Sequence, residues 1–106
     1  MASARSLFAA GNYTAARDQA LIAAKQAPNG GEAQLVLARA YLELGDGLAA
    51  DAVLTRAQSA GVSPVRLHAF RAAARLLQGD RDSALAEAIR AAPGDRVYVD
   101  LSVIHI

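Results

Sequence analysis

The 106-residue sequence contains no cysteine, few aromatic residues (5%) and no excess of either charge. Without cysteine, a disulfide, a thiolate nucleophile and a cysteine-based metal site are all impossible. No apolar run approaches the ~18 residues of a membrane-spanning helix, so we expect no membrane insertion. The 11 basic and 10 acidic residues give a net charge of +1, which offers no reason to expect nucleic acid as a partner.

The first residues, "MASARSLFAAGNY", also lack the long apolar segment of a signal peptide. We therefore expect a cytoplasmic protein if the chain is complete, and a periplasmic one if it is a fragment of an exported protein. The absence of cysteine leaves the redox compartment undetermined, so the sequence does not decide the location.

Alanine and leucine supply most of the apolar residues, which make up 54% of the chain. Both residues favour helices because they lose little side-chain entropy there. The composition predicts an all-α fold whose helices approach closely through small side chains. Its core should be thin, because alanine buries little area.

A short sequence motif recurs along the chain at a constant interval. Gly11, Gly45 and Gly79 are 34 residues apart. Each is followed directly by Asn or Asp, and an alanine lies five residues after each glycine. Further alanines repeat at the same interval: Ala4, Ala38 and Ala72; Ala16, Ala50 and Ala84; Ala23, Ala57 and Ala91. Self-similarity at a fixed period of this size indicates a helical solenoid or a related array.

Each repeat is predicted to hold two helices. In the middle of the chain we expect helices at about 32–44 and 47–60, separated by Gly45 and Asp46. Glycine ends a helix readily because it adopts the left-handed conformation, and aspartate caps the next helix by accepting a bond from a free amide. Ser63 and Pro64 predict the start of the following helix in the same way.

The 34-residue period, the phrases "GNYTAA" and "LGDGLAA", and Pro28-Asn29 resemble tetratricopeptide repeats. The resemblance implies a right-handed helical-hairpin solenoid with units at about 1–30, 31–64 and 65–94 within a single domain, 1–106. Gln34 and His68 depart from the family's large aromatic residue, and Gly47 and Arg81 replace its turn tyrosine. More loosely, the run from Tyr41 is similar to repeat proteins of bacterial polysaccharide-export and surface-sorting systems.

The ends differ from a complete repeat. The first unit lacks the start of its first helix, and residues 95–106 are interpreted as the first helix of a partial fourth unit. A short edge strand or a disordered tail is the alternative, because valine and isoleucine favour strands. The apolar "SVIHI" ending is not the polar cap that a solenoid needs.

No catalytic arrangement, metal site or cofactor site is predicted. His68 and His105 are isolated in the sequence, and His68 is interpreted as a core or edge residue rather than a ligand. The pair Asp80 and Asp82 is explained by helix capping. Glycine spacing does not fit a phosphate-binding loop, and scattered arginines argue against RNA. We therefore expect a protein that is not an enzyme.

The resemblance implies that the first helix of each unit lines a concave surface that binds a peptide or partner helix. Arg5 and Arg39, one period apart, would form a basic ladder, unless they serve only solubility. Phe8, Leu42 and Leu76 would form an apolar stripe, unless they belong to the core. The candidate groove residues are Arg5, Phe8, Glu32, Leu35, Arg39, Leu42, Glu43, Arg66, Ala69, Ala73, Leu76 and Leu77.

Two functions follow from this interpretation. The first is a protein–protein interaction scaffold whose concave groove binds a protein or peptide. The alternative is a self-associating module, a homo-oligomer that stacks through its truncated apolar ends by way of Tyr98, Leu101 and Ile104.

Overall fold

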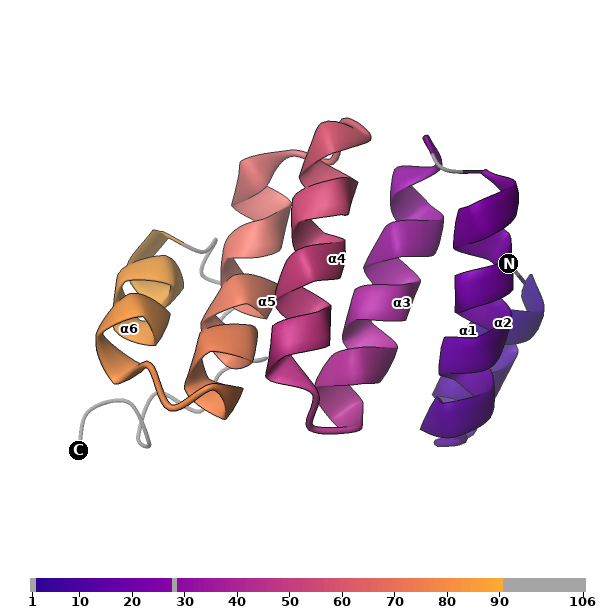
Figure 1. Cartoon of the computed structure of the whole chain (residues 1–106), viewed down its shortest axis with the longest axis horizontal. Coiled ribbons are helices and arrows are strands. Elements are labelled where there is room, and N and C mark those ends of the chain that lie inside the picture. Colours follow the sequence, from indigo (N-terminus) through magenta and orange to yellow (C-terminus); the bar gives the residue numbers. More distant parts are fainter. Residues whose placement is uncertain (1, 28, 91–106) are drawn as a thin grey trace.

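The computed structural model describes residues 2–27 and 29–90, which form six α-helices and no strand. Figure 1 shows the helices as successive hairpins placed side by side along the long axis of the molecule. The helices are α1 (Ala2–Ala9), α2 (Tyr13–Gln26), α3 (Gly31–Glu43), α4 (Gly47–Ser59), α5 (Pro64–Leu77) and α6 (Arg81–Arg90). The expected all-α helical-hairpin solenoid is confirmed.

The repeated Gly-Asn/Asp motif forms the turn inside each hairpin. Gly45 has a φ of +79°, and Asp46 accepts a hydrogen bond from the Ala49 amide at 3.1 Å. Asn12 and Asp80 cap α2 and α6 in the same way. Ser63 differs from its predicted role, because its side chain makes no capping bond, although Pro64 does begin α5. Proline needs no amide partner at that position, so the helix can start without the cap.

Replacement of Asp46 by alanine should lower the free energy of unfolding by about 1 kcal/mol, because the Ala49 amide loses its acceptor. Asp46→Asn keeps a side-chain oxygen and should lose much less. Urea unfolding followed by circular dichroism measures both variants. Equal losses in the two would show that the carboxylate charge, and not the capping bond, stabilises this turn.

The predicted helix limits are close to those observed. The helix expected at 32–44 begins one residue earlier and ends at Glu43, and the one expected to end at Ala60 ends at Ser59. Helix α1 has eight described residues, against 13 in α3 and 14 in α5. The fourth partial unit and Tyr98, Leu101 and Ile104 lie outside the described residues, so those assignments stay predictions.

Small side chains set the distances between helices. Each helix packs on the next in the chain, and α3 also contacts α1 and α5. The largest fully buried side chains are Leu37, Leu54 and Leu67, and alanine is the commonest residue of the cluster that holds them. Most core residues fall in two clusters: one reaches from α1 to α5, and a smaller one joins α5 and α6 through Ala72, Ala84 and Ala88.

A polar network ties the last two hairpins together. Arg75 of α5 donates through Nε to Asp51 of α4 at 2.5 Å, and through Nη1 to Ser83 of α6 at 2.7 Å. The hydrogen bond to Asp51 is the main cause of a raised Arg75 pKa, which burial opposes. Arg75 thus bridges α4, α5 and α6 through these two hydrogen bonds.

Candidate functional site

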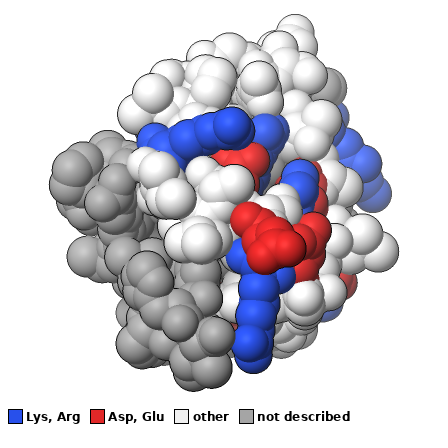
Figure 2. Space-filling view, turned by 90° about the vertical axis from the view of Figure 1, so that its left-hand side faces the viewer, with Lys and Arg blue, Asp and Glu red and all other residues white. Residues whose placement is uncertain are grey.

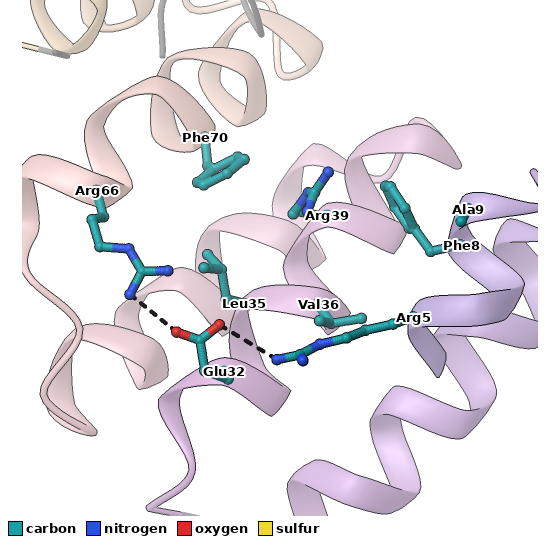
Figure 3. Close-up of a pocket in the computed structure, with 9 residues that line it drawn as sticks. All are labelled: Arg5, Phe8, Ala9, Glu32, Leu35, Val36, Arg39, Arg66 and Phe70. Atoms are coloured by element: carbon teal, nitrogen blue, oxygen red, sulfur yellow. Dashed lines mark hydrogen bonds and ion pairs between the residues drawn. The ribbon is translucent and has the colours of Figure 1, made fainter. Parts of the chain in front are cut away.

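A concave groove lies along α1, α3 and α5, the first helix of each hairpin. Its volume is about 650 Å³, and Figure 3 shows side chains from all three helices around it. The lining residues are Arg5, Phe8, Ala9, Glu32, Leu35, Val36, Arg39, Arg66 and Phe70. The groove combines apolar walls with four charged side chains, Arg5, Glu32, Arg39 and Arg66.

One carboxylate stands between two arginines at the edge of the groove. Glu32 Oε1 lies 3.0 Å from Arg66 Nη1, and Glu32 Oε2 lies 3.9 Å from Arg5 Nη2 (Figure 3). All three side chains are more than half exposed. Exposed ion pairs contribute little to stability, so these three side chains can exchange partners at small cost.

The third arginine lies between two aromatic rings. The Arg39 guanidinium carbon is 4.6 Å from the centre of the Phe8 ring and 6.0 Å from that of Phe70. Phe8 in turn meets Tyr13 edge-on, with ring centres 5.2 Å apart. Cation–π attraction holds the guanidinium of α3 against rings from α1 and α5, so Arg39 links its own helix to both neighbours.

The predicted candidates divide into two groups. Arg5, Phe8, Glu32, Leu35, Arg39 and Arg66 line the groove. The other candidates, Leu42, Glu43, Ala69, Ala73, Leu76 and Leu77, do not line it. Arg5 and Arg39 share one groove but do not form a ladder, because Arg5 faces Glu32 whereas Arg39 lies on the rings.

Two expectations about exposure need correction. Ala69, expected on the solvent-facing side of its helix, is 0% exposed, because α5 packs against α3, α4 and α6 at once. Leu35, which lines the groove, is likewise a buried residue at 6% exposed. In the expected apolar stripe, Leu42 packs on the larger core cluster and Leu76 on the smaller one, so only Phe8 reaches the groove.

Sequence reasoning missed three lining residues and one pairing. Ala9, Val36 and Phe70 were not among the candidates. Phe70 follows Val36 by one period of the repeat, and Arg66 follows Glu32 by the same interval, so both pairs occupy equivalent positions in successive repeats. Opposite charges at equivalent positions of adjacent repeats are a signal that predicts the Glu32–Arg66 ion pair.

Outside the groove, charged side chains of both signs are mixed. Figure 2 shows basic and acidic residues next to one another on the face that it presents, with no broad basic surface. His68 Nδ1 lies 2.7 Å from Glu87 Oε2, in a half-buried pair between α5 and α6. The described residues bring no three His, Asp or Glu side chains together as a metal site would.

Within residues 2–27 and 29–90, every helix is too short or too polar to cross a lipid bilayer. Among known families, a model described as the protein kinase G tetratricopeptide repeat matches residues 3–96. Neither a curated protein nor a solved structure gives a significant match.

Proposed function

The chain belongs to the protein kinase G tetratricopeptide repeat family, and on that basis we propose that it is a non-catalytic scaffold that binds a protein segment in its concave groove. Tetratricopeptide repeats typically act as protein-interaction modules. The observation that carries the proposal is the groove of about 650 Å³ lined by α1, α3 and α5.

The size and rigidity of the groove support this function. A hollow of this volume can receive several side chains of an extended segment, and it lies in the range of ligand sites in general. Its walls belong to helices held by a buried core, with Leu37 of α3 and Leu67 of α5 among the fully buried residues. A rigid surface loses little entropy on binding, which favours affinity.

A steric block tests the groove without changing its charge. Ala9 is exposed and lines the groove, whereas Ala52 is exposed on α4 and does not. Peptides selected from a random dodecapeptide phage library on the wild-type chain should bind Ala9→Trp at least about tenfold more weakly, which is a loss of about 1.4 kcal/mol. The matched control Ala52→Trp should bind like wild type.

Fluorescence anisotropy with the selected peptides measures these affinities. If the library yields no binder, or if Ala9→Trp binds as tightly as wild type, the groove is not the interaction surface. Circular dichroism of both variants verifies that a loss of binding does not come from a loss of folding.

A further inference from the structure

The groove carries a local charge that the chain as a whole does not. Three arginines and one glutamate line it, which leaves two net positive charges, against a net charge of +1 for the whole chain. This excess of positive charge would attract a partner carboxylate to the groove.

Resting on the proposed function, we propose that the partner is an acidic protein segment whose carboxylate displaces Glu32 from between Arg5 and Arg66. Glu32 then serves as an internal substitute for the partner while the groove is empty. Its two oxygens divide between the arginines, 3.0 Å from one and 3.9 Å from the other, so the longer contact leaves Arg5 weakly engaged. An incoming carboxylate can pair with both arginines, and arginine favours carboxylates through its parallel N–H donors.

Release of Glu32 has a low cost in this position. Its side chain is 54% exposed, so water takes over its hydrogen bonds when the arginines turn away. Glu32 also lies in the first turn of α3, where the helix dipole stabilises a negative charge without any arginine. The exchange therefore replaces a weak internal pair by the partner's own carboxylate.

The apolar part of the groove specifies a second feature of the segment. Phe8 and Phe70 stand on opposite sides of Arg39, and Leu35 and Val36 lie between α1 and α5 (Figure 3). A leucine, isoleucine or phenylalanine next to the acidic residue would bury its side chain against these groups. Arg39 lies close by as a further positive charge.

The same features favour protein over nucleic acid. The three arginines of the groove stand among apolar side chains, whereas a phosphate backbone is bound along a continuous basic track.

Sequencing of the library pool selected on the wild-type chain provides the first test. We expect enrichment of Asp or Glu beside Leu, Ile or Phe. A selected peptide with Asn and Gln in place of Asp and Glu should bind at least about tenfold more weakly, and binding should weaken as salt rises. Arg66→Glu should cause a similar loss, whereas Arg81→Glu, an exposed control on α6, should not.

The Glu32→Gln variant distinguishes an internal competitor from a glutamate that only stabilises the structure. Removal of the internal competitor should tighten binding of the acidic peptide by about threefold or more, since both arginines lose their resident carboxylate. Unchanged or weaker binding by Glu32→Gln would overturn the displacement of Glu32 by the partner.

The two proposals fail in different ways. Suppose that the selected peptides bind Ala9→Trp more weakly than wild type but are not enriched in Asp or Glu, or are enriched in basic residues. The proposal of an acidic partner is then overturned, and the groove stays the interaction surface. Tighter binding of a single-stranded oligonucleotide than of any selected peptide would also overturn the acidic partner. If no selected peptide binds Ala9→Trp more weakly than wild type, the proposed function of the groove is itself overturned.

Discussion

Gly47→Ala is expected to lower the free energy of unfolding by about 3 kcal/mol, since overpacking of a tight contact costs about 1–3 kcal/mol and the obstacle here is backbone. A Cβ at Gly47 would lie 2.5 Å from the Ala74 carbonyl oxygen and 2.7 Å from Leu77 Cβ. The backbone of α5 cannot turn aside as a flexible side chain would. The first turn of α4 must therefore move away from α5, which opens the junction between the second and third hairpins.

Gly45→Ala, in the turn just before Gly47, separates this clash from ordinary backbone strain. Gly45 has a φ of +79°, but a Cβ there would meet nothing within 4 Å. Its replacement should cost about 1–2 kcal/mol for the left-handed conformation alone. Urea and thermal unfolding followed by circular dichroism compare the two, and a melting temperature lowered by about 10 °C or more is expected for Gly47→Ala. Equal effects in the two variants would contradict the close approach of α4 to α5.

Leu54→Ala should have the second large effect, a loss of about 3 kcal/mol, because removal of a buried leucine side chain loses its apolar contacts and also leaves a cavity. Leu54 is 0% exposed in the middle of α4, within the larger core cluster. Alanine is the commonest residue of that cluster, and it has no side-chain freedom with which to fill the space. The loss should therefore lie well inside the range of about 2–5 kcal/mol for such changes.

Leu48→Ala provides the matched control, with the same substitution in the same helix. Leu48 is 73% exposed, so its truncation should change the free energy of unfolding by less than about 0.5 kcal/mol. Urea unfolding of both variants measures the difference. A similar loss from both positions would mean that the orientation of α4 is not the one described.

The helical hairpins could be predicted from the sequence because the interactions that form their turns are local. Glycine at the turn and an acceptor after it act within a few residues, so Gly45 and Asp46 are visible in the sequence and take the expected roles. In the sequence, Gly47 stands out only as a departure from the family pattern. Its reason is the approach of α5, a helix that belongs to the next repeat, and this packing of two helices has no local signal.

The groove could be predicted in part. Residues of the first helices were expected to face it, and Arg5, Phe8, Arg39 and Arg66 do line it. The exposure of each position depends on how many neighbours cover its helix, which is why Ala69 is buried. Helical periodicity predicts on which face of its helix a residue lies, but it does not predict how wide the opening between adjacent helices is.

The division of the core into two clusters affects how the molecule opens. The cluster that holds α6 consists of Ala72, Ala84 and Ala88 with partly buried neighbours, so detachment of α6 exposes little apolar area. Local unfolding of α6 should therefore need a lower free energy than unfolding of α3 or α4 in the centre. The groove lies on α1, α3 and α5, whose core is the other cluster. Fraying at α6 removes the contacts of α5 with the smaller cluster but leaves those with the larger one, so the binding surface should change less than α6 itself.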